Sequence, residues 1–407
     1  MSSSKNWPRQ GQIIDEPCKP TDGGSQDRLD TLRAEIDEID TQLASLLARR
    51  FALSQEIGRT KSKLGRKLMD ENREQIVLEK VSRGLPGDSS RDFILNVFRS
   101  LMKESLEHQE QTIASDDTRN RSERLFPNVC VIGCGLIGGA LARQIRSSFP
   151  STNLFAVDLA ETLPELEESK IFQDCRSTLD RSLIEKASLI LLACPPDLSL
   201  DLLKELAPLL SPSQVVVDLC SVKTQICDLA EQLDLNGAEF VGGHPFFGTE
   251  KAGFVNSAEV QIAGKTICLV PTLKSSELLM ARLRLWFSSM DLKVFISDAE
   301  SHDATVAVTS HLIQLIASSL GEVIHEELLE TGKGDHLALS GGALAGLSRL
   351  MSSRPELWAQ ISGQNRNAIS KATKKLVGRL NELIEDSTAF EATFAKAARV
   401  RNSLTGI

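Results

Sequence analysis

The stretch VCVIGCGLIGGALARQIRSSF, residues 129–149, decides the fold of the central part of this chain. A short β-branched run leads into the pattern Gly133-x-Gly135-x-x-Gly138, and a helical segment follows. Strand, glycine turn and helix in this order are typical of a dinucleotide-binding unit. Gly133 would permit the tight turn and Gly135 the close approach of a pyrophosphate. Gly138 would let the helix pack close to the strand.

The next apolar run, NLFAVD (153–158), ends at Asp158, about 20 residues after the last glycine, as in the dinucleotide fingerprint. A carboxylate at this place accepts hydrogen bonds from the adenosine ribose and repels a 2′-phosphate. No Arg or Lys follows it in DLAETLPE, so we predict NAD rather than NADP as the cofactor. The alternative is a glycine-rich turn in a sheet protein that binds no nucleotide.

Further short apolar runs follow at SLILLAC (188–194), QVVVDLC (214–220) and EFVGG (239–243), and helical stretches separate most of them. This alternation predicts an α/β Rossmann domain over residues 128–298, a doubly wound parallel sheet with helices on both faces. After a last strand at LKVFIS (292–297) the pattern is helical to the end. We therefore expect an all-helical domain over residues 299–407.

Before the glycine turn the apolar period is helical. Apolar residues recur every three or four positions and predict a helix that ends near Leu64: Leu29, Leu32, Ile36, Ile39, Leu43, Leu46, Leu47, Phe51 and Ile57. At 1.5 Å per residue this helix is about 55 Å long. A helix of this length cannot bury its stripe in a small domain, so we expect a homodimer.

Two further helices are expected over residues 71–83 and 89–112. The apolar side chains of the second should face inward, at Phe93, Val97, Phe98, Leu101 and Met102. Residues 27–112 thus form a three-helix domain. A disordered tail (1–26) precedes it and a polar linker (113–127) follows it.

Composition excludes several classes of protein. The formal net charge of -9 argues against a general nucleic-acid binder, which needs surplus Lys and Arg. The N-terminus lacks an apolar signal region, and no stretch of about 18 apolar residues stands out to span a bilayer, so we expect a soluble cytoplasmic protein without a membrane partner. The eight cysteines contain no C-x-x-C pair, which supports neither a metal site nor a disulfide framework.

Two motifs lie at predicted strand ends, DLCSVK (218–223) and GGHPFFGTEKAG (242–253). Ligands bind outside the carboxyl ends of strands in such sheets, so Ser221 and His244 can converge on a nicotinamide. An isolated histidine is more often structural. A histidine between Gly-Gly and Pro on a strand-end loop is well placed for acid–base catalysis, with a pKa expected near the reference value of about 6.5.

Together with SHDATVAVTSHL (301–312) and GLSRLMSSRPELW (346–358), these motifs resemble prephenate dehydrogenases over about residues 128–370. The resemblance implies that prephenate loses a hydride to NAD⁺ and then CO₂, giving 4-hydroxyphenylpyruvate without a metal. It implies that His244 takes the proton of the ring hydroxyl and that Ser221 holds this hydroxyl. Arg349 would bind the side-chain carboxylate.

In the same family pattern Thr249 and Glu250 line the mouth of the site, and His311 is also present. Some members have a second histidine three residues after His311, where this chain has Gln314. The difference leaves the choice between prephenate and arogenate open.

Residues 27–112 resemble the all-α chorismate mutase. All eight polar positions of that family's pocket are matched here, by Arg33, Arg50, Lys61, Asp70, Arg73, Glu74, Ser105 and Gln109. The resemblance places Lys61 and Gln109 at the ether oxygen of chorismate. Arg33, Arg50 and Ser105 would bind the carboxylates with support from Arg73, and Glu74 and Asp70 would bind the ring hydroxyl. The reaction that the resemblance implies is a Claisen rearrangement of chorismate. The enzyme needs only to hold the substrate in a compact conformation and to stabilise the charge that develops on the ether oxygen.

The chain is therefore predicted to be a bifunctional enzyme of tyrosine biosynthesis that acts on chorismate and then on prephenate. One alternative is a prephenate or arogenate dehydrogenase whose first domain only regulates or dimerises. Another is a non-catalytic NAD-sensing protein, which would leave Ser221, His244 and Arg349 unexplained.

Overall fold

The computed structural model describes residues 23–64, 71–83, 89–249 and 251–405. The chain divides into two compact units, Met1–Asp116 and Asp117–Ile407, and each is described by itself. Most of the predicted tail, as well as Gly65, Asp70 and Glu250, lies outside the described residues.

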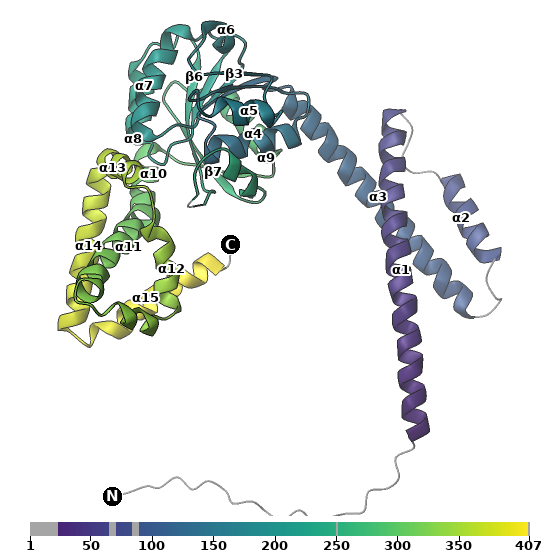
Figure 1. Ribbon diagram of the computed structural model, residues 1–407. Helices are drawn as coiled ribbons and strands as arrows, with labels where there is room; N and C mark the ends of the chain where they lie inside the picture. The colour runs from purple at the N-terminus through teal and green to yellow at the C-terminus, as the bar shows by residue number, and fades with distance from the viewer. Residues whose placement is uncertain (1–22, 65–70, 84–88, 250, 406–407) are drawn as a thin grey trace, which may run out of the picture. The chain divides into compact units, whose positions relative to one another are not determined.

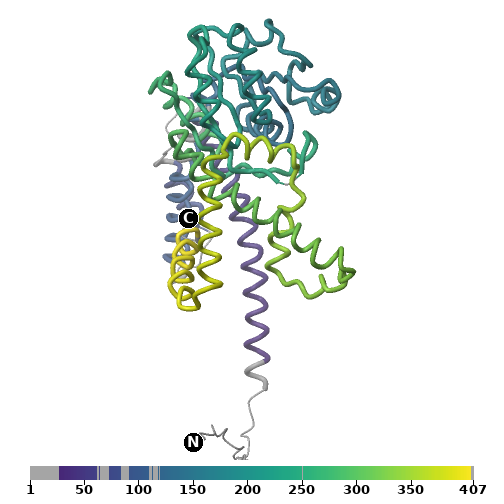
Figure 2. The backbone as a smooth tube through the Cα atoms, turned by 90° about the vertical axis from the view of Figure 1, so that its left-hand side faces the viewer, coloured from purple at the N-terminus to yellow at the C-terminus, as the bar shows by residue number. Residues whose placement is uncertain are grey.

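The first unit is helical, as predicted. It contains α1 (Gly23–Lys63), α2 (Glu71–Arg83) and most of α3 (Ser89–Glu123), and α1 is one continuous rod in both views (Figure 1, Figure 2). The third helix does not end near residue 112 but continues to Glu123, so most of the segment expected as a linker is helical. Residues 113–123 contain neither Gly nor Pro, which would end a helix, and Pro127 follows soon after the last turn.

Much of the apolar stripe of α1 is exposed in the single chain. Its side chains are between 43% and 63% exposed at Leu29, Leu32, Ile36, Ile39, Leu43, Leu46, Phe51 and Ile57. The expected inward orientation of Phe93 and Val97 is wrong for the single chain, because these residues are 70% and 41% exposed. One copy of this unit cannot cover its apolar surface.

The second unit contains one eight-stranded sheet in the order β3-β2-β1-β4-β5-β6-β7-β8. The strands are β1 (Asn128–Ile132), β2 (Asn153–Val157), β3 (Asp174–Arg176), β4 (Leu189–Leu192), β5 (Val215–Asp218), β6 (Glu239–Pro245), β7 (Thr266–Pro271) and β8 (Lys293–Ile296). The first six are parallel and follow the order of a dinucleotide-binding fold.

The sheet differs from the predicted one at its two edges. The sequence analysis missed β3, which has only three residues and no apolar run, and β7. Strand β7 pairs antiparallel with β6, and β8 pairs parallel with β7. In the described residues between β6 and β7 the one helix is the short η2 (Val255–Glu259), and an antiparallel pair needs no crossover helix.

Helices cover both faces of the sheet (Figure 1). Alternate strand side chains enter two separate cores, with Val129 and Val131 in one and Cys130 and Ile132 in the other. The first core is closed by α4 (Leu136–Ser148), α5 (Leu163–Glu168) and α9 (Glu277–Ser288). The second is closed by α6 (Arg181–Ile184), α7 (Pro196–Leu206), η1 (Ala207–Leu209) and α8 (Thr224–Gln232).

The remainder of the chain is helical, as expected. It contains α10 (Ala299–Val306), η3 (Ala307–His311), α11 (Leu312–Ile324), η4 (His325–Leu329), η5 (Gly334–Leu339), α12 (Gly342–Met351), α13 (Pro355–Gln364), α14 (Arg366–Glu385) and α15 (Ala389–Thr405).

One helical run in the described part of the chain, Ala299–Leu329, is long and apolar enough to cross a bilayer by length and composition alone. The expectation that no such stretch exists is wrong by this measure, since 18 of its residues average a hydropathy of 1.3. The run begins with His302 and Asp303, which are buried at the edge of the sheet. Its apolar side chains Val308, Ile313, Ile316, Leu320 and Val323 are exposed.

Candidate active sites

The glycine turn lies between β1 and α4. The φ angle of Gly133 is +88°, a conformation that favours glycine. A Cβ on Gly138 would lie 2.0 Å from the carbonyl oxygen of Gly133, so the helix approaches the strand as closely as a backbone allows. A Cβ on Gly135, by contrast, would meet nothing within 4 Å. The turn therefore leaves open space at the N-terminus of α4, where free N–H groups suit a pyrophosphate.

Asp158 follows β2 at the same edge of the sheet. Its carboxylate accepts the N–H of Cys134 at 2.5 Å and the N–H of Leu159 at 2.7 Å. These bonds hold the carboxylate beside the glycine turn. Arg176, at the end of neighbouring β3, is paired with Asp174 at 3.0 Å. The turn and the carboxylate together fit a dinucleotide that carries a free ribose hydroxyl.

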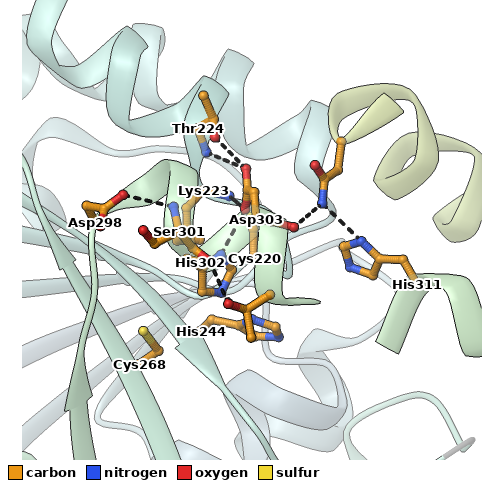
Figure 3. A network of polar contacts seen from close by, with 12 residues as sticks. Cys220, Lys223, Thr224, His244, Cys268, Asp298, Ser301, His302, Asp303 and His311 are labelled. Atoms are coloured by element: carbon orange, nitrogen blue, oxygen red, sulfur yellow. Dashed lines mark hydrogen bonds and ion pairs between the residues drawn. The ribbon is translucent and has the colours of Figure 1, made fainter. Parts of the chain in front are cut away.

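His244 lies near the end of β6 and begins a chain of polar contacts (Figure 3). Its Nδ1 lies 2.8 Å from Nε2 of His302, and Nδ1 of His302 lies 2.8 Å from Oδ1 of Asp303. The ring of Phe246 lies against His244, with 4.2 Å between the ring centroids. A strand end and a helix start 58 residues later thus share one hydrogen-bonded chain.

Asp303 is the anchor of this chain. Its Oδ1 also accepts the N–H of Lys223 at 2.8 Å, and its Oδ2 accepts the N–H and the hydroxyl of Thr224 at 2.8 and 2.6 Å. Burial would raise the pKa of Asp303, but the hydrogen bonds from His302, Thr224 and the backbone hold it below its ordinary value. The group is therefore an anion in the folded protein.

A buried ion pair supports the same region. Lys223 is fully buried, and its ammonium contacts the carboxylate of Asp218 and donates to the carbonyl of Gly243 at 2.7 Å. Burial alone would lower the pKa of Lys223, but the charge of Asp218 raises it above its ordinary value. Asp218 also accepts the N–H of Gly243 at 3.2 Å. The pair thus ties the end of β5 to the residue that precedes His244.

The surroundings of His244 favour its neutral form. Burial is the main cause that places the pKa of His244 well below 6.5, and the neighbouring basic groups His302, Lys223 and His311 act in the same direction. The expected pKa near 6.5 must therefore be corrected downward. A neutral imidazole at pH 7 is the form that can accept a proton.

The other predicted dehydrogenase residues lie at different places. Ser221 is half-buried in the loop after β5, the strand that pairs with β6. Thr249 is exposed in the loop after β6, where its Oγ1 accepts the N–H of Lys251 at 3.3 Å. Arg349 is exposed in the last turn of α12 and is not part of the hydrogen-bonded series that contains His244. Glu250 lies outside the described residues.

His311 and Gln314 are both buried and both hold helices together. The Nδ1 of His311 lies 3.2 Å from the amide nitrogen of Asn365, and burial lowers the pKa of His311 to about 4. Gln314 donates to the carbonyl of Leu350 at 2.7 Å and accepts the hydroxyl of Ser353 at 3.1 Å. Gln314 therefore fixes the end of α12, beside Arg349.

The sequence analysis assigned no role to His302, Asp303 or Lys223. The signal was present, because SHDATVAVTSHL and DLCSVK were both noted as motifs. What could not be read was that a buried aspartate at the start of α10 binds the start of α8, 80 residues earlier. Among the described residues, no group of three or more His, Cys, Asp or Glu side chains could hold a metal ion.

The first unit contains a cavity of about 600 Å³ between its three helices. Six of the eight predicted mutase residues line it: Arg50, Lys61, Arg73, Glu74, Ser105 and Gln109. Its apolar walls include Leu53, Val77 and Met102, and the sequence analysis missed Arg49 and Ser54, which also line it. Three cations and one carboxylate among these six suit a small dianion with a hydroxyl group.

Contacts between α1 and α3 set the geometry of this cavity. Arg50 donates to the hydroxyl of Ser105 at 3.0 Å, and Gln109 donates to the hydroxyl of Ser54 at 2.6 Å. Gly58 explains how Gln109 fits, because a Cβ there would lie 2.7 Å from Cγ of Gln109. The side chain of Gln109 thus crosses α1 at its buried glycine.

The structure does not bring Arg33 to this cavity. Its guanidinium is exposed and pairs with Asp30 at 3.3 Å on the same helix. Arg33 precedes Arg50 by 17 positions, which is about 26 Å along an α-helix. The remaining predicted residue, Asp70, lies outside the described residues.

Three family models match the chain. They are chorismate mutase type II over residues 32–110, the nucleotide-binding domain of prephenate dehydrogenase over residues 141–295, and the dimerization domain of prephenate dehydrogenase over residues 298–391. Together they match most of the described chain, although the second begins just after the glycine turn.

Two similar proteins span both parts. The chain is 27% identical to the T-protein of Haemophilus influenzae over 345 residues, which covers 82% of this chain and 80% of the relative. It is 25% identical to the T-protein of Enterobacter agglomerans over 379 residues, which covers 90% and 91%. A prephenate dehydrogenase of Bacillus subtilis is 25% identical over 261 residues, which covers 63% and 67%.

Solved structures resemble the second unit. The arogenate dehydrogenase of Synechocystis is 27% identical, with a TM-score of 0.56, and covers 69% of this chain and 98% of its own. The prephenate dehydrogenase of A. aeolicus, in complex with hydroxyphenyl propionate and NAD⁺, has a TM-score of 0.59 at 24% identity and covers 68% and 96%. The latter likeness shows the shared fold.

Proposed function

This chain belongs to the family of bifunctional chorismate mutase–prephenate dehydrogenases, and we propose how the residues of its two sites carry out the two reactions. It rearranges chorismate to prephenate and oxidises prephenate to 4-hydroxyphenylpyruvate with NAD⁺, in tyrosine biosynthesis. The single observation that carries the proposal is that each unit contains a separate constellation for one of these reactions.

The cavity of the first unit suits the rearrangement. Arg50, oriented by Ser105, binds a carboxylate of chorismate, and Glu74 binds the ring hydroxyl. Lys61 and Gln109 stabilise the charge that develops on the ether oxygen. No covalent intermediate is needed, because holding the compact conformer and stabilising this charge are sufficient.

The sheet edge of the second unit suits the oxidation. His244, neutral and half-buried, accepts the proton of the ring hydroxyl, and Ser221 at the adjacent strand end orients this hydroxyl. The glycine turn and Asp158 would hold NAD⁺, which would supply the acceptor for the hydride from the same carbon. Loss of CO₂ then makes the ring aromatic. Arg349 binds the side-chain carboxylate of the substrate, while Thr249 and Glu250 border the entrance.

We assign residues 27–112 to the mutase domain, 128–298 to the nucleotide-binding domain and 299–407 to the helical domain. The family models over residues 32–110, 141–295 and 298–391 support this assignment, in which the second domain begins 13 residues before its model and the third ends 16 residues after its model. Helix α3 continues from the mutase domain through most of the intervening segment.

The active form in this proposal is a homodimer. The exposed apolar side chains of α1 and of α11 support it, as does the match to a dimerization domain. In such a dimer Arg33 enters the cavity of the partner. A mixture of Arg33→Ala and Arg50→Ala chains should then recover mutase activity in heterodimers. No recovery, despite subunit exchange shown by native mass spectrometry, would mean that one chain builds each cavity.

The proposed location is the cytoplasm, without a nucleic-acid or membrane partner. The net charge of -9 and the biosynthetic relatives support this placement.

The test supplies the purified full-length protein with chorismate, with and without NAD⁺, and identifies the products by mass spectrometry. Prephenate should accumulate without NAD⁺, and 4-hydroxyphenylpyruvate should form with it. Arogenate supplied in place of prephenate measures the preference that Gln314 leaves open. If the protein oxidises neither prephenate nor arogenate, the proposed dehydrogenase activity is refuted.

Two variants assign the roles. His244→Asn should lower the dehydrogenase kcat by roughly 10²–10⁴ with a small change in KM, as for a positioned general base. Arg349→Ala should mainly raise KM for prephenate. Both should keep mutase activity, which controls for folding of the first unit, and NAD⁺ binding controls for folding of the second. An unchanged kcat in His244→Asn would show that another group takes the proton.

A further inference from the structure

The contacts of Asp303 determine where the hydrogen of His302 lies. Both oxygens of Asp303 accept from backbone N–H groups, one from Lys223 and one from Thr224, each at 2.8 Å. Asp303 is an anion in the folded protein, and an ionised carboxylate can only accept hydrogen bonds, so neither oxygen has a proton to give. Nδ1 of His302, 2.8 Å from the same Oδ1, must therefore be the donor. In its neutral form the His302 ring therefore carries its hydrogen on Nδ1.

The same argument extends one ring further. A neutral imidazole with its hydrogen on Nδ1 has an acceptor at Nε2. In His302 this Nε2 faces Nδ1 of His244 at 2.8 Å, so His244 donates from Nδ1. Its own Nε2 then carries a lone pair. His302 is 4% exposed, so water has little access to compete for this contact.

We infer that Asp303 and His302 are positioning residues that fix the tautomer of His244, with the hydrogen on Nδ1 and the lone pair of Nε2 left for the substrate hydroxyl. The inference rests on the proposed role of His244 as the base. Without this chain an imidazole exchanges between two tautomers, and only one of them can accept at Nε2.

The chain also stabilises the product of proton transfer. When the ring hydroxyl gives its proton to Nε2, the O–H bond breaks, an N–H bond forms, and His244 becomes a cation. Its Nδ1 continues to donate to His302, which in turn donates to the anionic Asp303. A fixed negative charge at the end of the chain balances the cation in a buried site.

The charged groups around His244 determine how its proton-accepting form depends on pH. Lys223, on the loop before α8, and His311, on η3, oppose a positive charge on His244. Asp303, on α10, is the carboxylate at the end of the hydrogen-bonded series that begins at His244. A proton on Nε2 of His244 removes its free lone pair, so the ascending limb of the rate belongs to His244.

The first experiment reads the tautomer directly. The full-length protein is labelled with ¹⁵N-histidine, and the ring nitrogens of His244 are assigned by comparison with His244→Asn. We expect a hydrogen on Nδ1 and a bare Nε2 at pH 7.5. Exposed His336 provides the contrast of a ring in exchange with water. A hydrogen on Nε2 of His244 overturns the inference, whether or not the protein oxidises prephenate.

The second experiment compares His302→Leu with His302→Gln. Leucine removes the acceptor and should lower the dehydrogenase kcat by about 10²-fold or more, the scale of a lost tautomer. In glutamine the amide NH₂ is drawn toward Asp303 and the carbonyl faces His244, so kcat should return to within about tenfold of wild type. KM for prephenate, NAD⁺ binding and mutase activity should stay close to wild type in both.

The outcomes separate the two proposals. Equal kcat in the leucine and glutamine variants would overturn the role of His302. It would show that the hydrogen-bond acceptor of glutamine does not restore the rate, as expected if His302 were only structural. Parallel changes in KM, NAD⁺ binding and melting temperature would do the same. The expected tautomer in a protein that does not oxidise prephenate would instead refute the proposed function.

Discussion

Replacing Gly138 with alanine should damage the fold of the second unit, whereas replacing Gly135 should damage only the binding of NAD⁺. The two glycines belong to the same turn but have opposite surroundings. A Cβ on Gly138 would lie 2.0 Å from the carbonyl oxygen of Gly133, whereas real Cβ atoms stay beyond 3.0 Å. A Cβ on Gly135 would meet nothing within 4 Å.

The distances give the expected magnitudes. Gly138→Ala forces α4 away from β1 by roughly 1 Å, and an overpacked core of this kind costs about 1–3 kcal/mol. Each kcal/mol lowers the Tm of a domain of this size by about 2–4 °C. Gly135→Ala should leave Tm within about 2 °C of wild type. If the pyrophosphate passes over Gly135, the new methyl group should raise Kd for NAD⁺ at least about tenfold, or 1.4 kcal/mol.

Differential scanning fluorimetry with and without NAD⁺ measures both effects, and isothermal titration gives Kd. Mutase activity of both variants shows whether the first unit is intact. NAD⁺ binding at wild-type affinity in Gly135→Ala would refute the placement of the pyrophosphate at the open face of the turn. An unchanged Tm in Gly138→Ala would show that α4 can move away from β1 without cost.

Three further predictions concern other parts of the chain. NAD⁺ should exceed NADP⁺ at least about tenfold in kcat/KM, and Asp158→Asn should narrow this ratio because the charge that repels a 2′-phosphate is lost; equal use by the wild type would contradict the role of Asp158. Lys61→Ala should lower mutase kcat about 100-fold and leave the oxidation of supplied prephenate intact, whereas parallel loss of both in a folded chain would indicate a shared site. The pKa of His311 is about 4 in the folded protein and about 6.5 in the unfolded chain. Between these two pH values the unfolded chain binds a proton at His311 that the folded protein does not bind. The free energy of unfolding should therefore fall by up to roughly 3 kcal/mol as the pH drops from 6.5 to 4. Urea unfolding at both pH values should show a smaller fall in His311→Gln, and an equal fall would assign the effect to other groups.

Local sequence signals determined most of the elements of this protein and the class of its two sites. The glycine turn could be read because φ preference and close packing act over a few residues, at Gly133 and Gly138. The helices of the first unit could be read because a 3.6-residue apolar period is visible in the chain itself. The polar residues of the mutase cavity were found by resemblance, and the structure brings six of the eight together.

Only the tertiary structure decided how distant segments combine. The direction of β7 depends on its partner β6, and no pattern within TICLVP reveals this choice. Arg33 has the expected residue type, but the rise of α1 carries it away from the cavity of its own chain. The chain from His244 through His302 to Asp303 joins segments 58 residues apart. Hydrogen bonds of 2.8 Å depend on positions within a few tenths of an ångström, and packing of the whole sheet edge sets these positions.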